Sequence, residues 1–444
     1  MAATSGYGER QAAIHLVRSG VSPADAARQL NRSLAWVYKW YNRFGSGQSW
    51  ESLKDLSRAP KKHPNTLSKA VCQAIIQARS ELEAEAAQPE HLSYIGAHAV
   101  QNRLGQKGLR HLPSISSIER TLAAAGMTRP RKPAALAVVY PRLHASQPHQ
   151  LIQADIVPHF LPGGPCVSCF NAIDVASKYS AGEQYLTKRS GDAANFLILM
   201  WKRIGIPKYT QLDNEACFSG GSTHPGVLGK VLRLSLLVGT ELVFSPFRHP
   251  ESNATVERFH QDYNANVWRK AELAQLEHVH QHSATFFQLY NQSGHHSALN
   301  GQSPTQVHRS HLARRLPETF ILPVVIPLTT GRVHFMRLVS QARKVSILNL
   351  DWDVPAAQPG QGVWATLEFT LKGASLTVYD APPDAVRRKR LARHPFPLRQ
   401  PVLSSHKAFQ PPVPPRQSWL GRVTNIFRPS LIPMRALRSL STMF

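Results

Sequence analysis

The ten residues PESNATVERF, Pro250 to Phe259, mark the point where a loop rich in Pro and Asn turns into a helix that carries Glu257 near its start. Asp213 stands earlier at the end of an apolar strand, with 43 residues between it and Glu257. Asp155 lies further upstream in a mostly apolar strand, with 57 residues between it and Asp213. Strand-like and helical stretches alternate around these acids, which predicts an α/β domain that carries three carboxylates.

The chain around the acids gives the order of elements in this domain. We place the domain at residues 146–311 and expect a long helical stretch over 252–291 after its last strand. Alternating and apolar runs predict strands at 151–157, 167–175, 179–185, 208–212 and 241–244, and helical periodicity predicts helices at 192–204 and 226–238.

A helix-turn-helix domain is predicted at residues 1–58. Apolar residues recur at helical spacing over 8–44, Ser22 and Pro23 form a helix start, and Ser33 is placed to cap the third helix. The cations Arg32, Lys39 and Arg43 fall outside the apolar face of that third helix, as contact with a DNA major groove requires. A three-helix bundle with a solvated basic face remains the alternative.

A second helical domain, winged-helix-like, is predicted at 66–128 from helical patterns at 68–85, 96–105 and 114–125. The segments on either side of it are basic and contain Pro. We expect their cations to contact DNA, and the candidates are Arg58, Lys61, Lys62, Arg129, Arg131 and Lys132.

The C-terminal part of the chain changes pattern twice. Residues 331–379 alternate at period two, which predicts a small all-β domain, a compact barrel, over 320–380. Residues 381–444 hold 12 Lys and Arg against the single acid Asp384, together with many Pro. We expect this basic, Pro-rich tail to be disordered when free, and to contact phosphate or order on a partner protein.

Composition limits the class of protein. The 444 residues include 52 Lys and Arg against 27 Asp and Glu, a formal charge of +25, which is atypical of a metabolic enzyme and points to a polyanionic partner. An apolar fraction of 42% argues against a disordered protein. The absence of a long apolar run or a signal-like start, together with only four Cys, predicts a cytoplasmic protein without a membrane segment.

Three carboxylates near one sheet would repel each other in a site of low dielectric constant. A divalent cation removes that penalty, and hard oxygen ligands suit Mg²⁺, two ions of which can serve one phosphodiester. Glu251 is a rival to Glu257 as the third ligand, and Glu215 is a candidate for an outer position. We interpret Asp174 as structural.

Two other groups of metal-ligand residues carry weaker signals. Cys166 and Cys169 form a lone CxxC, which we interpret as structural because no second pair completes a zinc site. The residues His278, His280 and His282 do not converge on one metal if they lie on a helix.

Taken with their surroundings, the three acids resemble the motif of a DDE-type transposase of a bacterial insertion sequence with a retroviral-integrase-like core. The resemblance implies a ribonuclease H-like fold and makes Asp155, Asp213 and Glu257 the metal-binding catalytic residues. It implies supporting roles for Asn214 and Asn253 and places Arg258 near DNA. Two positions depart from the family pattern, Ala254 and Glu215, each standing where the family often has Gly.

The resemblance implies a reaction on DNA. The protein would bind transposon ends, hydrolyse a strand to expose a 3′-OH and join it to target DNA, with two Mg²⁺ ions or Mn²⁺ in their place. It would act as a dimer or higher oligomer, with a possible helper protein such as an ATPase on the tail, in the bacterial nucleoid. The alternatives are a non-catalytic DNA-binding regulator and a metal-dependent nuclease that does not join strands.

Overall fold

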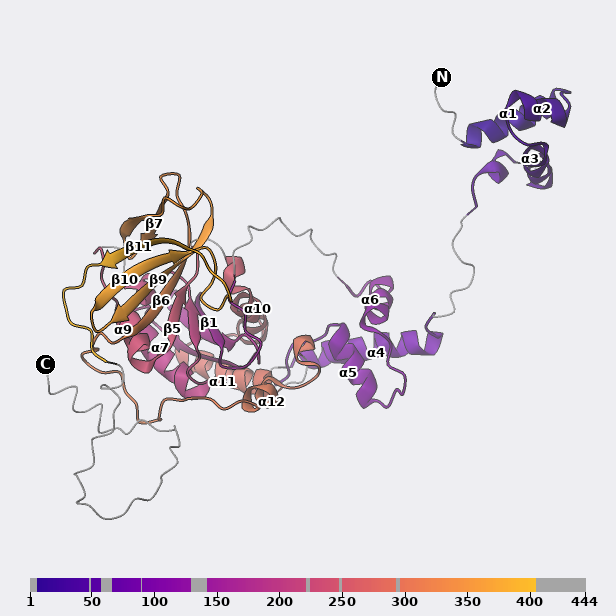
Figure 1. Ribbon diagram of the computed structural model, residues 1–444. Helices are drawn as coiled ribbons and strands as arrows, with labels where there is room; N and C mark the ends of the chain where they lie inside the picture. The colour runs from indigo at the N-terminus through magenta and orange to yellow at the C-terminus, as the bar shows by residue number, and fades with distance from the viewer. Residues whose placement is uncertain are drawn as a thin grey trace, which may run out of the picture. The chain divides into compact units, whose positions relative to one another are not determined.

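A computed structural model describes residues 6–47, 49–56, 66–88, 90–128, 142–220, 224–246, 250–292 and 296–404. The chain divides into two compact units at Ser68 and Lys69 (Figure 1). Within the described ranges, no helix is both long and apolar enough to cross a membrane.

The N-terminal unit is a bundle of three helices, which confirms the predicted helix-turn-helix domain. The hydroxyl of Ser22 accepts a hydrogen bond from the backbone N of Asp25 at 3.2 Å, and that of Ser33 caps the third helix in the same way. Ile14, Trp40 and Leu53 form its buried centre. The elements are α1 (Gly6–Arg18), α2 (Pro23–Gln29), α3 (Leu34–Gly47) and the short helix η1 (Trp50–Leu53).

The second unit begins with three further helices, α4 (Lys69–Ala86), α5 (Ala97–Gln106) and α6 (Ile115–Ala124). They pack on one another, and Ile75, Val100 and Ile118 are fully buried. Residues 66–88 and 90–128 contain no strand, so the winged-helix expectation is wrong for this range. The segment between α5 and α6 has no alternating apolar pattern that would form a wing.

A nine-stranded mixed sheet forms the centre of the second unit. Its order is β11-β10-β9-β6-β5-β4-β1-β2-β3, in which β1, β4, β5 and β6 are parallel neighbours and every other pair is antiparallel. The first five strands are β1 (Leu151–Phe160), β2 (Cys166–Asp174), β3 (Ser180–Tyr185), β4 (Tyr209–Leu212) and β5 (Glu241–Phe244). The last four are β6 (Gly331–Leu338), β9 (Gly362–Thr370), β10 (Gly373–Tyr379) and β11 (Arg390–Phe396).

Helices cover both faces of this sheet, so each face has its own apolar core (Figure 1). Alternate residues of a strand point to opposite faces, and accordingly Ile152 packs with α7 and α9 while Ile173 packs with α10 and α11. This confirms the α/β core. The helices are α7 (Ser190–Arg203), α8 (Ala216–Ser219), α9 (Lys230–Val238), α10 (Ala254–Tyr263), α11 (Leu276–Gln292) and α12 (Pro304–Arg309), with the short turns η2 (Pro250–Asn253), η3 (Asn264–Trp268) and η4 (Ser297–Leu299).

The separate β-barrel domain expected over 320–380 is a wrong prediction. β6 pairs in parallel with β5, Leu242 lies opposite Val333, and the rings of Phe244 and Phe335 stack 5.1 Å apart, so these strands extend the core sheet. Only β7 (Lys344–Ile347) and β8 (Leu350–Asp353) form a separate two-stranded sheet. Period-two alternation identifies strands but says nothing about which sheet they join.

Two further boundaries differ from expectation. The tail expected from residue 381 onward is ordered at its start, because β11 pairs with β10 along Ala374 to Tyr379; residues 405–444 lie outside the described part. The long helical stretch over 252–291 is broken at the π-helical turn η3 and resumes only at Leu276.

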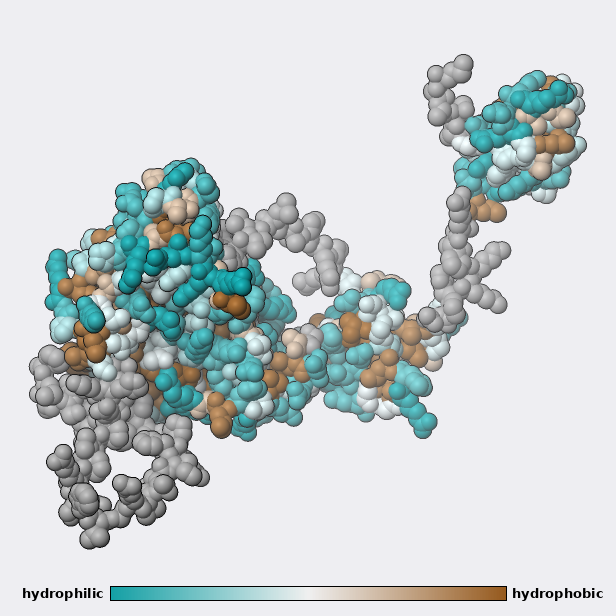
Figure 2. All heavy atoms as spheres, in the orientation of Figure 1, coloured by the Kyte–Doolittle hydropathy of each residue, from teal (hydrophilic) through white to brown (hydrophobic). Residues whose placement is uncertain are grey.

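Hydrophilic residues cover much of the described surface in the view of Figure 2. Exposed large apolar side chains occur singly at Leu56, Phe160 and Leu371, whereas Ile321, Val324 and Val325 share one connecting segment. Leu34, Tyr38 and Tyr41 stand at helical spacing on one face of α3. Scattered apolar residues of this kind are normal on a protein surface.

Candidate active site

Two of the three predicted acids lie at neighbouring parallel strands, Asp155 within β1 and Asp213 directly after β4. Gln153 on β1 pairs with Gln211 on β4, so Asp155 and Asp213, each two residues further along, lie side by side. Because side chains two apart on a strand share a face, the carboxylate of Asp155 projects on the side of the sheet that α10 covers, and Asp213, directly after β4, lies near enough for the charge of Asp155 to act on it. The third acid, Glu257, lies in the first turn of α10, which packs against β1 and β2.

The carboxylates influence one another. Burial, followed by the charges of Glu257 and Glu215, raises the pKa of Asp155 to about 6. Burial, followed by the charge of Asp155, raises the pKa of Asp213 to about 7, and burial raises the pKa of Glu257. Ionising all three together therefore costs free energy that a bound divalent cation would offset. The oxygen-only donor set fits Mg²⁺ or Mn²⁺.

Buried amides connect the two strands to the start of α10. The Nε2 atoms of Gln153 and Gln211 donate to the carbonyl of Ser252 at 3.1 and 2.9 Å, and Gln211 also donates to Oδ1 of Asn253 at 2.6 Å. Oε1 of Gln153 accepts the backbone N of Thr255 and Val256 at 3.1 and 3.3 Å. These bonds hold the first turn of α10, and with it Glu257, against the strands that carry the aspartates.

Asn214 and Asn253, the two predicted supporting residues, lie in one network. The hydroxyl of Ser245 donates to Oδ1 of Asn253 at 2.9 Å, and its carbonyl accepts Nδ2 of Asn214 at 2.5 Å. Ser245 directly follows β5, so it joins the end of that strand to the residue after Asp213 and to the residue before α10. The buried Arg337 of β6 completes the network on the far side of Asn214.

Two residues at the site were not predicted from the sequence, His260 and Lys188. His260 lies one turn after Glu257 on α10, is 5% exposed, and places its Nδ1 atom 3.7 Å from a carboxylate oxygen of Asp155. Burial lowers the pKa of His260 to about 4, so the ring is neutral near pH 7. Lys188 pairs with Glu215 at 2.9 Å and lies near both aspartates. The i, i+3 spacing of Glu257 and His260 was the available signal.

The rival ligands occupy different positions. Glu215 donates its backbone N to Oδ1 of Asp213 at 3.1 Å and faces Lys188 with its side chain. Asp174 is fully buried and accepts four hydrogen bonds from the backbone of His149, Ala176 and Ser177 and the hydroxyl of Ser177. Glu251 lies in η2, and its side chain is outside the described part.

The predicted DNA contacts are of three kinds. Lys39 and Arg258 lie on exposed surface, and the side chain of Arg258 is 68% exposed beside Asp262. Arg32 and Arg43 also stabilise the N-terminal unit, Arg32 by an ion pair to Glu9 at 2.6 Å and Arg43 by a bond to the carbonyl of Lys54 at 2.7 Å. The linker cations lie outside the described residues: Arg58, Lys61, Lys62, Arg129, Arg131 and Lys132.

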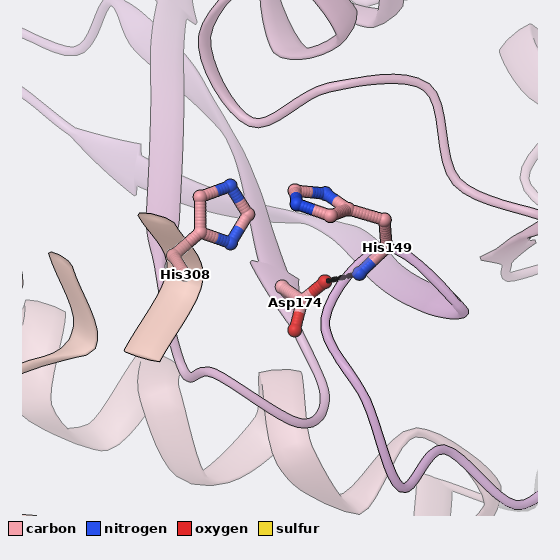
Figure 3. Close-up of side chains that lie close together, drawn as sticks. All are labelled: His149, Asp174 and His308. Atoms are coloured by element: carbon pink, nitrogen blue, oxygen red, sulfur yellow. Dashed lines mark hydrogen bonds between the residues drawn. The ribbon is translucent and has the colours of Figure 1, made fainter. Parts of the chain in front are cut away.

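One cluster has the composition of a metal site, but two of its three members already use their ligand atoms in hydrogen bonds. Ligand atoms of His149, Asp174 and His308 lie within 4.8 Å of one another (Figure 3). His308, however, places Nε2 2.7 Å from the carbonyl of Ile204 and Nδ1 2.9 Å from the hydroxyl of Ser177, and its ring stacks on Tyr179. Both oxygens of Asp174 are already hydrogen-bonded. A metal would have to break these bonds, so we interpret the cluster as a structural network.

Two parts of the chain match known families. Residues 8–49 match the model of a homeodomain-like domain, and residues 238–304, which include Glu257, match the model of an integrase core domain. A segment that matches an integrase core thus follows a segment that matches a homeodomain-like domain, the order expected of a transposase or integrase. This confirms the resemblance drawn from the sequence motifs.

Solved structures similar to the chain come from viral integrases. They include the intasome of simian T-cell lymphotropic virus in complex with a PP2A regulatory subunit (14% identity, 73% of this chain and 99% of that chain, TM-score 0.32). They also include the catalytic core of HTLV-2 integrase in complex with magnesium (12%, 37% and 99%, TM-score 0.28). A third is the catalytic core of BIV integrase (16%, 36% and 95%, TM-score 0.28).

Proposed function

We propose that the protein is a DNA transposase that cuts at the ends of a mobile DNA element and joins the exposed 3′-OH to target DNA. The observation that supports the proposal is the position of Asp155 on β1 and of Asp213 directly after the parallel neighbour β4, with Glu257 near enough for its charge to raise the pKa of Asp155. Burial and neighbouring charges raise the pKa of Asp155 and Asp213, which costs a structural protein stability, whereas a phosphodiester-cutting site needs such carboxylates to hold its cations.

Asp155, Asp213 and Glu257 would hold Mg²⁺, two ions per site, and Mn²⁺ would substitute. When bound, the ions supply activation of the attacking oxygen and stabilisation of the leaving oxygen. The protein supplies the position of the carboxylates: Gln153 and Gln211 fix Glu257 relative to the two strands. His260, neutral and buried, lies against Asp155 and limits the directions in which that carboxylate can point.

DNA binding is divided over separate surfaces in this proposal. On α3, Lys39 and the exposed rings of Tyr38 and Tyr41 present one side of the helix to a major groove, with Arg32 at its start. Beside the acids, Arg258 lies one residue after Glu257 on exposed surface, where it would contact the backbone of the DNA that is cut.

Two ends must be brought together before joining, so we expect the working form to be a dimer or higher oligomer on DNA. The segment 405–444, outside the described residues, is the proposed place for a helper protein such as an ATPase. Its apolar and basic composition suits an interaction that orders only on binding.

The test is an assay on a supercoiled plasmid that carries the inverted repeats flanking the gene, with protein and Mg²⁺. A transposase gives nicked ends and joined products. Binding without any cleavage would instead identify a DNA-binding regulator, and cleavage without joining would identify a nuclease; either result contradicts the proposal. The same reaction with Glu257→Gln is the control for a contaminating nuclease, because any product it retains does not come from this site.

A further inference from the structure

Arg337 lies in β6, in the part of the chain that follows the core acids by more than 70 residues, and is only 6% exposed. Its guanidinium donates from Nη2 to Oδ1 of Asn214 at 2.8 Å and from Nη1 to the carbonyl of Ser245 at 3.1 Å. It also donates from Nη1 to the carbonyl of its neighbour Met336 and from Nε to the carbonyl of Ser346 on β7, at 2.8 and 3.1 Å. One side chain therefore joins the ends of β4 and β5 to β6 and β7.

Arg337, Asn214 and Ser245 form a ring of hydrogen bonds in which each residue contacts the other two. The Asn214 side chain accepts from Arg337 at Oδ1 and donates from Nδ2 to the carbonyl of Ser245, which itself accepts from Arg337. The backbone N of Ser245 in turn donates to the carbonyl of Leu212, the residue before Asp213, at 2.9 Å. The backbone on both sides of Asp213 is thus held by this triangle of three residues.

Such a position is costly for an arginine. Burial of a guanidinium requires that its donors be satisfied, and burial lowers the pKa of Arg337 to about 9, which still leaves it charged at neutral pH. An apolar side chain would be sufficient to pack β6 against its neighbours, as Val333 and Phe335 do on the same strand. The planar fork of donors that Arg provides is what the two acceptors Asn214 and Ser245 require.

We propose that Arg337 is a positioning residue for the metal-binding acid Asp213, acting through Asn214. It fixes the end of β4 and so the spacing between Asp213 and Asp155 that the cation site needs. This inference rests on the proposed function, since it assigns Arg337 a task at the same site. It also makes the strands after residue 331 part of the catalytic structure, because the site is incomplete without β6.

The experiment compares full-length Arg337→Lys, Arg337→Met, Asn214→Ala and the Arg337→Lys/Asn214→Ala double variant with the wild type. The matched control is Arg332→Lys on the same strand, where the side chain of Arg332 is 42% exposed and pairs with Glu241 at 2.8 Å. Three quantities are measured: Mn²⁺ affinity by electron paramagnetic resonance, joining rate of a pre-cut end against Mg²⁺ concentration, and affinity for end DNA. The melting temperature reports folding.

We expect Arg337→Lys and Asn214→Ala each to weaken Mn²⁺ binding and raise the half-saturating Mg²⁺ concentration at least tenfold, with end affinity within twofold of wild type. The double variant should lose no more Mn²⁺ affinity than the single variant that binds Mn²⁺ less tightly, because both changes break the same connection between Arg337 and Asn214. Arg332→Lys should behave as wild type in every measurement.

Three results would overturn the inference. The first is wild-type Mn²⁺ affinity and joining in folded Arg337→Lys and Asn214→Ala. The second is multiplicative losses in the double variant, which would show that the two residues act separately; these two variants decide the matter even if Arg337→Met does not fold. The third is a wild-type chain that neither binds Mn²⁺ nor joins ends, which would overturn the proposed function as well and is recognised without any variant.

Discussion

Gln153 and Gln211, each two residues before an aspartate, lie opposite each other on β1 and β4, with Nε2 of Gln153 3.4 Å from Oε1 of Gln211. Both amides reach across to the turn before α10 and hold the carbonyl of Ser252. The same two glutamines therefore fix the position of Asp155 along β1 relative to Asp213 after β4. They also hold the start of α10, which carries Glu257, against both strands. A buried network of this kind stabilises the fold only when every donor has an acceptor, because a buried donor without an acceptor costs free energy.

Replacing Gln211 by Leu should reduce joining far more than it reduces stability. The change leaves the Ser252 carbonyl and the Asn253 side chain short of a donor and lets the start of α10 move, and a displacement near 1 Å costs about 100-fold in rate. The measurement is single-turnover joining beside a thermal melt. Gln184→Leu on β3 is the control, since Gln184 is as buried as Gln211. Equal loss of rate in both variants would refute the role of Gln211.

Asp213→Asn should stabilise the metal-free protein at pH 8. A carboxyl group whose pKa is raised on folding, here from 3.8 to about 7, binds its proton more tightly in the folded state. The protonated Asp213 carboxyl therefore raises the free energy of unfolding at pH 4, and this stabilisation is lost as pH rises towards 7 and beyond. A shift of this size corresponds to roughly 4 kcal/mol at most.

The corresponding measurement is a set of melts in EDTA at pH 4 and pH 8, with Asp351→Asn at an exposed site as the control. The gain in melting temperature over wild type should appear at pH 8 and disappear near pH 4. Mg²⁺ at pH 8 should raise the melting temperature of wild type and not of Asp213→Asn. A variant less stable than wild type at pH 8 would show that Asp213 is not a strained carboxylate.

The start of the basic tail should contribute to DNA affinity by neutralising phosphates. No acid lies between residues 385 and 400, and four cations on and before β11 are exposed: Arg387, Lys389, Arg390 and Arg393. Changing all four to Ala should lower the slope of log K against log salt by about 0.9 for every phosphate that is no longer neutralised. Lys372→Ala on the turn before β10 serves as the control for removal of a charge alone. An unchanged slope would place these cations away from DNA.

On α3, the exposed tyrosine and lysine should have separable effects. Tyr38→Ala should lower affinity for end DNA by about tenfold, equal to 1.4 kcal/mol, and leave affinity for random DNA nearly unchanged, because in the proposed function the exposed ring of Tyr38 reads a base edge. Lys39→Ala should weaken both affinities alike. Fluorescence anisotropy at two salt concentrations measures this, with exposed Gln29→Ala on α2 as the control. Equal behaviour of Tyr38→Ala and Gln29→Ala would exclude α3 as the reading helix.

Local signals were enough to predict most of the helices and strands and to single out the three acids as candidates. The Ser22–Pro23 start, the Ser33 cap and the strand end before Asp213 all depend on neighbouring residues, and each is found where it was expected. The strand that carries Asp155 runs on to Phe160, past its expected end at residue 157. The joining of β6 to β5 was not predictable from the sequence, because a strand pattern carries no information about its partner at long range.

At the candidate site, too, local patterns are visible in the sequence but long-range contacts are not. Gln153 and Gln211 stand two residues before aspartates, a spacing visible in the sequence, yet their shared contact with Ser252 exists only once β1, β4 and α10 have packed. Arg337 has no such local signal: it is one of 52 cations in the sequence, and only the sheet brings it to Asn214 across 123 positions of the chain.

The central claim is that Asp155, Asp213 and Glu257 form a metal-dependent DNA-joining site, and Asp155→Asn tests it most directly. The measurement is the joining of a pre-cut transposon end to plasmid DNA in Mg²⁺, beside the affinity for the same end. The account predicts end affinity within about twofold of wild type and no detectable joined product, since one ligand of the cation site is removed. Undiminished joining by Asp155→Asn in Mg²⁺ would contradict it.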